Sequence, residues 1–454
     1  MSPRNRELMA LIPASLLVTA GFTAIFIQRQ DLLSNVSLTY GLLFLALCLA
    51  AHIVLRLTLP YADPYLFPLV ALLACFGLVM VYRIDDTLAR QQAQWFVIGL
   101  ILFSATIILL RDYSVLERYR YVIALISLGL LLLPRVPGIG SQVNGAYLGI
   151  HFAGTTFQPA EFAKIGIVIF LASYLRDTRQ LLVTAGQRFM GITFPPLKHF
   201  GPLLVVFGAA MLELLIIRDL GSSLMFFGGF LAMLYVATNR LSFPLIGLLI
   251  FALGAWFIGT HTPHVQDRID AWQHPFQASL YNRTGGSFQI AQSVFAQADG
   301  GLFGQGFGEA LISYPCQING HDATCPLLPA AQTDLIYSVI TNELGLFGAC
   351  GLILIYALVV ERGFRIAILA RDSFSKLLAT GLTAVVALQV FVIVGGVTRA
   401  IPLTGVTLPF VSYGGSSLVS NFIILALLIR VSATPDHGAA AAAGFDSPKA
   451  KVRR

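Results

Sequence analysis

The sequence predicts an all-α polytopic membrane protein, and three observations support that fold class. The 454 residues are 57% hydrophobic and only 11% charged, whereas about a quarter of the residues in soluble domains are charged. Apolar runs of about twenty residues, the length that crosses a bilayer core, recur along most of the chain. The formal net charge of +7 is typical of basic cytoplasmic loops, so we interpret it as membrane topology and expect no nucleic-acid partner.

The apolar runs predict about twelve membrane-spanning helices. The short polar break Arg218-Asp219-Leu220 leaves open whether 201–237 forms two helices or one broken helix that dips and returns. The chain shows no signal peptide with a small-residue cleavage site, so the first run is expected to stay as a helix. The predicted spans are 8–27, 37–58, 65–82, 92–111, 119–134, 158–175, 201–217, 221–237, 242–260, 334–361, 375–398 and 405–432.

Lys and Arg gather in alternate loops, which indicates how the helices are oriented, because cytoplasmic loops are enriched in these residues. The basic side is expected to be cytoplasmic and to hold both termini, and the polar segment 261–333 is expected to face outward. The tail 433–454, with its Ala run and basic end, is expected to be disordered in the cytoplasm. The basic clusters lie at 4–6, 111–120, 176–198, 240, 362–376 and 449–454.

The outward segment 261–333 is too long to be an idle connector. Long loops are usually functional or disordered, and aromatic residues such as Trp272 and Phe303 argue against disorder. Cys316 and Cys325 also lie here, where an oxidising compartment permits a disulfide. Two free thiols are the alternative, and metal binding by this pair lacks nearby ligands beyond His321.

Polar motifs interrupt the apolar runs at several places. They are Val143 to Ala146, Gln158 to Lys164, Asp219 to Ser223, Gly300 to Gly306, Thr333-Asp334, Glu343 to Gly345, and Pro402 to Ser417. Their order and spacing resemble the SEDS family (shape, elongation, division and sporulation), of RodA or FtsW type, and the last motif alone is highly specific. This sequence departs from the family pattern in two places: Tyr147 to Gly149 stand where an Arg-Trp pair is common, and Asn342 replaces one residue of an acidic pair.

The resemblance implies a ten-helix core over 63–432 and two additional helices within 1–62. It implies a glycosyltransferase of the bacterial cytoplasmic membrane that polymerises lipid II into glycan strands beside a class B penicillin-binding protein. Whether it serves elongation or division stays open. A lipid flippase or transporter, or a non-catalytic scaffold for a penicillin-binding protein, are the alternatives, since broken helices and intramembrane charges also occur in transporters.

Asp334 is the predicted catalytic residue. It lies where the outward loop meets a helix, and the family resemblance implies a catalytic Asp at this position. A helix cap is the alternative role, and the two are compatible. The acceptor sugar hydroxyl needs a base, whereas the leaving pyrophosphate needs its charge neutralised rather than a general acid.

Further residues are predicted to bind substrate or to line its cavity. Arg268, Arg399 and Lys164 are the candidate cations for the pyrophosphate, or a divalent metal such as Mg or Mn could serve; no organic cofactor is expected. For Arg399 the alternative is an interface anchor, and for Glu161 and Lys164 it is a mutual ion pair. Asp219 and Ser416 are included because they lie in family motifs at broken helix ends.

Overall fold

The structure is a computed structural model of the 454-residue chain. The predicted span 201–217 except for Gly208, the break at Arg218 and Asp219, and the tail 434–454 lie outside the residues that it describes. It describes residues 2–433 except 29–35, 137–139, 144–145, 153–154, 185–186, 190–191, 195–207, 209–219, 262, 284–285 and 319–320.

Eight of the described helices are long and apolar enough to cross a membrane, which confirms the polytopic all-helical class. Six of them run roughly along the runs that the sequence predicts; α14 and α16 differ at their ends. The eight are α1 (Pro3–Gln28), α2 (Val36–Thr58), α3 (Leu66–Ile84), α4 (Asp86–Leu109), α9 (Leu220–Thr238), α14 (Ile336–Leu369), α15 (Ser373–Val397) and α16 (Gly415–Ser432).

Three further helices correspond to predicted spans. The helix α7 (Ala160–Thr184) has 25 residues, or about 37 Å at 1.5 Å per residue, but carries Glu161, Lys164, Arg176 and Asp177. The helix α6 (Arg120–Leu132) follows the short α5 (Ser114–Arg118), and α10 (Ser242–His261) follows α9. At 13 residues, α6 is shorter than the run 119–134 and ends in a turn around Pro134.

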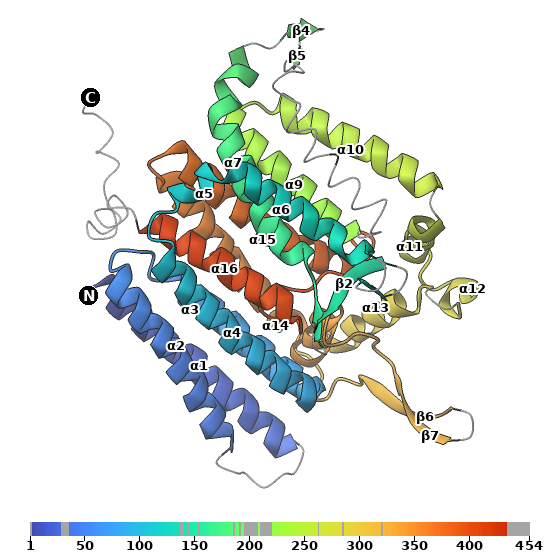
Figure 1. The fold of residues 1–454 in the computed structure, drawn as a ribbon. Helices are drawn as coiled ribbons and strands as arrows, with labels where there is room; N and C mark the ends of the chain where they lie inside the picture. Colours follow the sequence, from blue (N-terminus) through green and yellow to red (C-terminus); the bar gives the residue numbers. More distant parts are fainter. Residues whose placement is uncertain are drawn as a thin grey trace.

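The helices form one bundle in which α16 packs on α4, and α15 packs on α14, α9 and α7. The pair α1 and α2 lies along the outside, against α3 and α4 (Figure 1). Figure 1 also shows that α1 begins and α16 ends at the same end of the bundle as α5. The polar segment 261–333 lies at the opposite end.

That opposite end is built from short elements. They are the helices α11 (Pro263–Gln273), α12 (Ala278–Tyr281) and α13 (Phe288–Gly300), and the antiparallel hairpin of β6 (Ser313–Ile318) and β7 (His321–Pro326). The hairpin projects away from the helices (Figure 1). Segment 261–333 is therefore folded over most of its described length, as its aromatic residues indicated.

Small antiparallel sheets also form in two other polar segments, where no strand was predicted. Such segments extend beyond the helices, and pairing with themselves satisfies their backbone hydrogen-bonding groups. The strands are β1 (Gly140–Val143), β2 (Ala146–Phe152) and β3 (Thr155–Phe157) in one sheet, and β4 (Gln187–Phe189) and β5 (Ile192–Phe194) in another.

The last helix, α16, begins at Gly415, ten residues later than the predicted span 405–432. The preceding residues 398–414, called here the α15–α16 loop, contain Pro409 and positive φ angles at Gly405 and Phe410, which a helix cannot accommodate. The loop packs closely between helices: a Cβ on Gly77 of α3 would lie 2.6 Å from the backbone of Val411.

Helix α14 is longer than the predicted span 334–361 and is kinked at Gly345, whose φ is 67°. The glycine-rich segment 300–306 packs against this kink. A Cβ on Gly304 would lie 2.1 Å from the carbonyl oxygen of Glu343, and a Cβ on Gly300 would lie 2.1 Å from that of Thr341. Glycine is therefore required by close backbone approach here.

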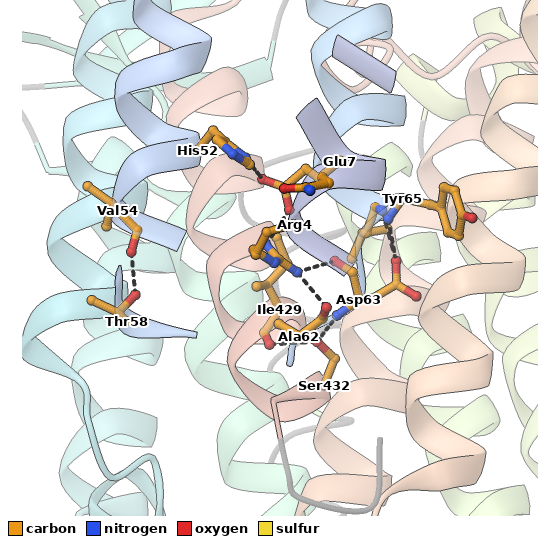
Figure 2. Close-up of polar contacts among 12 residues, drawn as sticks. Arg4, Glu7, His52, Val54, Thr58, Ala62, Asp63, Tyr65, Ile429 and Ser432 are labelled. Carbon is orange, nitrogen blue, oxygen red and sulfur yellow. Dashed lines mark hydrogen bonds and ion pairs between the residues drawn. The ribbon is translucent and has the colours of Figure 1, made fainter. Parts of the chain in front are cut away.

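A buried cluster of charges joins α1 and α2 to the rest of the bundle (Figure 2). Glu7, which is fully buried, accepts from Arg4 and contacts Nδ1 of His52 at 2.7 Å. Arg4 also donates to the carbonyl oxygens of Ala62 and Asp63, directly before α3. We call Arg4, Glu7 and His52 the extension cluster.

Candidate active site

Asp334 lies half-buried in the turn that leads into α14. The α15–α16 loop holds the backbone just before it: Tyr413 donates its N–H to the carbonyl of Gln332 at 2.8 Å, and Ser412 donates its hydroxyl to the carbonyl of Thr333 at 2.7 Å. Helix α14 begins at Ile336. The predicted base is thus positioned by two chain segments that lie far apart in the sequence.

Gly405 faces the carboxylate of Asp334. A Cβ built on Gly405 would lie 3.7 Å from Oδ2 of Asp334, and the φ of Gly405 is 78°, a conformation that other residues adopt only with strain. At this point the loop has no side chain next to the carboxylate of Asp334. The volume that a side chain at position 405 would fill is therefore open, and the hydroxyl of a substrate could approach the carboxylate there.

Arg268 and Arg399 both connect α11 to the α15–α16 loop. Arg268 donates to the carbonyl of Leu403 at 3.0 Å, two residues before Gly405. Arg399 donates to the carbonyls of Trp272 and Gln273 at 2.9 Å each, at the C-terminal end of α11, where a cation is electrostatically favoured. Two N–H groups of Arg399 are therefore engaged in this contact, which resembles the anchoring alternative more than a free phosphate ligand.

Lys164 and Glu161 form an ion pair inside the bundle. Lys164 is 1% exposed, and its ammonium donates to Glu161 Oε2 at 2.5 Å, to Gln389 Oε1 at 3.0 Å and to Asn421 Oδ1 at 3.4 Å. Ser420 also donates to Glu161, at 3.1 Å. Lys164, Glu161, Gln389, Asn421 and Ser420 are called here the core cluster. Its placement favours the mutual ion pair over direct contact of Lys164 with a substrate.

Ser416 is buried at the start of α16, and its hydroxyl accepts from the backbone N–H of Gln158 at 2.9 Å. This bond ties the beginning of α7 to the beginning of α16. Asp219, the remaining predicted site residue, lies outside the described residues, and α9 begins directly after it at Leu220.

Cys316 and Cys325 form a disulfide with an S–S distance of 2.05 Å. The bond joins β6 to β7 and so closes the projecting hairpin. The chain from the end of β7 to Asp334 is only eight residues long, so the hairpin and the predicted base belong to one continuous segment.

Gln389, Asn421 and Arg83 are among the polar side chains inside the bundle that sequence reasoning missed. Gln389 and Asn421 belong to the core cluster, and Arg83 donates to Glu343 at 2.9 Å and to the carbonyls of Gly308 and Ala310 at 2.6 and 2.8 Å. The signal was available, because an isolated amide or Arg within or at the end of an apolar span suggests a specific partner. The partners themselves lie 225 or more residues away, and no local pattern names them.

Within the described part of the chain, no three His, Cys, Asp or Glu side chains are grouped as metal ligands. Asp334 contributes a carboxylate at this site. Mg²⁺ in phosphate sites is commonly held by one or two carboxylates together with the phosphates of the substrate. The residues present therefore fit a divalent ion that arrives with a pyrophosphate, rather than one held by the protein alone.

Comparison with known proteins finds a matching family model and relatives that align over most of this chain. The family model described as "Cell cycle protein", for FtsW, RodA and SpoVE, matches residues 63–437. Peptidoglycan glycosyltransferase RodA of Mycobacterium leprae is 39% identical over 445 residues, covering 96% of this chain and 91% of that protein. Stage V sporulation protein E of Bacillus subtilis is 31% identical over 382 residues, covering 82% of this chain and 96% of that protein.

Solved structures agree with the sequence relatives. A chain from a study entitled "Structural coordination of polymerization and crosslinking by a peptidoglycan synthase complex" superposes with a TM-score of 0.63 at 25% identity, over 82% of this chain and 97% of that one. The rod shape determining protein RodA of Thermus thermophilus superposes with a TM-score of 0.56 at 25% identity, over 82% and 96%. The chain therefore belongs to the FtsW, RodA and SpoVE family of cell cycle proteins, as its motifs indicated.

Proposed function

We propose that this protein is a peptidoglycan glycosyltransferase that polymerises lipid II into glycan strands, with Asp334 as its general base. The activity follows from relatives that carry that name and align over 96% of the chain. The observation that carries the role of Asp334 is its half-buried carboxylate, which faces the side-chain-free backbone of Gly405. The chemistry needs a carboxylate with space beside it for a sugar hydroxyl.

In the proposed reaction, the 4-hydroxyl of the acceptor sugar attacks the anomeric carbon of the donor. The new C–O bond forms as the bond from that carbon to the pyrophosphate oxygen breaks, and its electron pair leaves with the polyprenyl pyrophosphate. Asp334 takes the proton of the hydroxyl and later releases it to water. A single displacement inverts the anomeric centre, and the leaving group needs no general acid.

The negative charge on the leaving pyrophosphate needs a cation. Arg268 is the first candidate, because it donates to Leu403 two residues from Gly405. A Mg²⁺ or Mn²⁺ ion bound jointly by Asp334 and the pyrophosphate would supply further charge neutralisation. Chelation should then lower polymerisation and either metal should restore it; full activity after exhaustive chelation would exclude the ion.

The proposed orientation puts α11, α13 and the β6–β7 hairpin outside the cytoplasmic membrane and both termini in the cytoplasm. Support comes from the basic residues near the opposite end of the bundle, where α1 begins and α16 ends (Figure 1). The relatives at 39–40% identity are named RodA, whereas those named FtsW are 32–34% identical. This difference favours a role in elongation over one in division.

We also propose a class B penicillin-binding protein as the partner. The support is the likeness to a chain from a complex that coordinates polymerization and crosslinking. The projecting hairpin, closed by Cys316 and Cys325, offers an extracytoplasmic surface for such a contact, and the membrane lipid surrounds the helices.

The test is polymerisation of labelled lipid II by the purified protein, alone and with its penicillin-binding partner. Asp334→Asn and Asp334→Ala should lower the rate by about 10²–10⁴-fold, the usual contribution of a positioned acid or base. Asp299→Asn is the matched control, because Asp299 is an exposed carboxylate in the same polar segment, and it should polymerise like the wild type.

Each outcome distinguishes the hypotheses. Polymer from wild type and control but not from folded Asp334 variants supports the enzyme and its base. Equal polymer from every variant removes Asp334 from the mechanism. Polymer from none, even with the partner present, favours the scaffold, and lipid II movement across vesicles under those conditions favours the flippase.

A further inference from the structure

Every N–H donor of the buried Lys164 ammonium has an acceptor within the core cluster. An ammonium has three N–H donors, and Lys164 directs them to Glu161, Gln389 and Asn421. Isolated charges in a membrane are costly, so the cluster accounts for the burial of Lys164. It does not by itself account for the choice of an amide at 389.

Gln389 is fully buried in α15, and its two ends have different partners. Its Oε1 accepts from Lys164 at 3.0 Å, while its Nε2 donates to the carbonyl of Thr407 at 2.9 Å. An ammonium can only donate and a carbonyl can only accept, so only this orientation of the amide satisfies both. The charge of Lys164 also polarises the amide and strengthens its N–H as a donor.

Thr407 follows two residues after Gly405, the residue of the α15–α16 loop that faces Asp334. Among the described residues, 402–407 make no backbone–backbone hydrogen bond. Two side chains hold this stretch instead: Arg268 donates to Leu403 and Gln389 donates to Thr407. Gly405 is midway between the two anchored carbonyls.

We propose that Gln389 is a positioning residue for the glycosyl transfer, and that Lys164 acts through it. The pair holds the carbonyl of Thr407 and thereby keeps Gly405 in its place beside the carboxylate of Asp334. This inference rests on the proposed function for its effect on rate, but the position of the loop can be measured without activity. A misplacement of about 1 Å in such a site can lower a rate about 100-fold.

The decisive variants are Gln389→Glu and Gln389→Met. In Gln389→Glu, the ionised carboxylate would still accept from Lys164 but could not donate to Thr407, whereas Met removes both contacts. If Gln389 only neutralised Lys164, the Glu variant would be active. The positioning role instead predicts that both variants and Lys164→Met lose roughly 10–100-fold in kcat with KM almost unchanged.

The double variant Lys164→Met with Gln389→Met should lose no more kcat than either single variant, because both residues act through one hydrogen bond, from Gln389 to Thr407.

His52→Leu is the control for loss of a buried polar contact, because His52 lies in the extension cluster, away from the loop. Hydrogen exchange of segment 400–414 is the readout that needs no activity. It should accelerate in both Gln389 variants and in Lys164→Met, and stay at the wild-type rate in His52→Leu.

Several results would overturn the proposal. They are wild-type kcat in Gln389→Glu, multiplicative losses in the double variant, or unchanged exchange of 400–414 in all core variants. If the wild type makes no polymer, the proposed function fails, yet the exchange measurement still decides whether Gln389 positions the loop. Faster exchange with unchanged kcat would show that Gln389 holds the loop but that the position of the loop does not affect the reaction rate.

Discussion

The core cluster and the extension cluster both bury a carboxylate with a cation, but they use the charge differently. In the core, each donor of Lys164 has an acceptor, and the network continues through Gln389 to the loop beside Asp334. In the extension cluster, Arg4 Nε and His52 Nε2 have no partner among the described residues. That network reaches the backbone of Ala62 and Asp63 (Figure 2) and does not extend to Asp334 among the described contacts.

The difference indicates what each cluster does. The extension cluster lies where α1 and α2 meet the region that the family model matches, since that match begins at residue 63. Asp63 continues the joint by donating its N–H to Ser432 at 3.0 Å, at the end of α16. We infer that the extension cluster holds α1 and α2 against the bundle, whereas the core cluster affects the reaction by positioning the loop beside Asp334.

The largest effect is expected from Glu161→Ala. It leaves Lys164 buried without a carboxylate, which typically costs about 3–5 kcal/mol, and polymerisation should be lost. Replacing both partners, as Glu161→Leu with Lys164→Met, should restore most of the unfolding free energy, because paired apolar replacement of a buried ion pair is often neutral. Polymerisation should stay about 10–100-fold below the wild-type rate, as in Lys164→Met, since Gln389 then has no cation to order it.

Thermal unfolding in detergent and lipid II polymerisation measure the two quantities separately. A double variant that polymerises at the wild-type rate would contradict the link between the core cluster and the active site.

Glu7→Ala should cost a similar amount of stability, up to about 3–5 kcal/mol, but should leave the rate per folded molecule within about twofold, because distant sites act independently. Arg6→Ala is the matched control, since Arg6 is an exposed neighbour in the same helix. Unfolding is followed as above, and the rate is normalised to the folded fraction. A large fall in kcat would show that the extension reaches the active site.

The smallest change in the free energy of unfolding is expected from Asp85→Ala, because Asp85 is an accessible charge. It serves as a reference for the buried charges. Asp85 caps α4 by accepting from the N–H groups of Thr87 and Leu88. The hydrogen bond from the Thr87 hydroxyl is the main cause that lowers the pKa of Asp85. Asp85→Ala should therefore cost about 1 kcal/mol.

The sign of the pH dependence follows from the lowered pKa. The folded protein binds the proton of Asp85 less readily than the unfolded chain, in which the pKa of this carboxyl is 3.8. The contribution of Asp85 is thus fully present above that value and is lost as the pH falls through the folded pKa. Unfolding at pH 5 and pH 8 should show the same difference between wild type and Asp85→Ala; a difference that grows toward pH 8 would contradict this assignment.

Composition and periodicity predicted the helices well because each apolar run must satisfy its own backbone within a membrane. Eleven of the twelve predicted spans have a described helix, and the twelfth falls outside the described residues except for Gly208. The end of the α15–α16 loop was predicted less well. The run 405–432 is apolar throughout, and hydrophobicity alone does not register the positive φ angles at Gly405 and Phe410.

The candidate site was predictable only in part. The family motifs pointed to Asp334, and Glu161 and Lys164 stood out as charges in an apolar run. Their roles were not accessible in the same way, because Gln389 and Asn421 approach Lys164 from helices 225 and 257 residues away. A polar side chain in a span signals that a partner exists, but the packing of the bundle selects that partner.

The sequence by itself determined that this chain is a helical membrane protein of the SEDS type, since apolar length and local motifs are properties of short segments. The tertiary structure decided which backbone faces Asp334 and which charges are enclosed together. Those contacts join α7, α11, α15, α16 and the turn before α14. They depend on how helices cross one another, and that geometry is established only when the whole bundle packs.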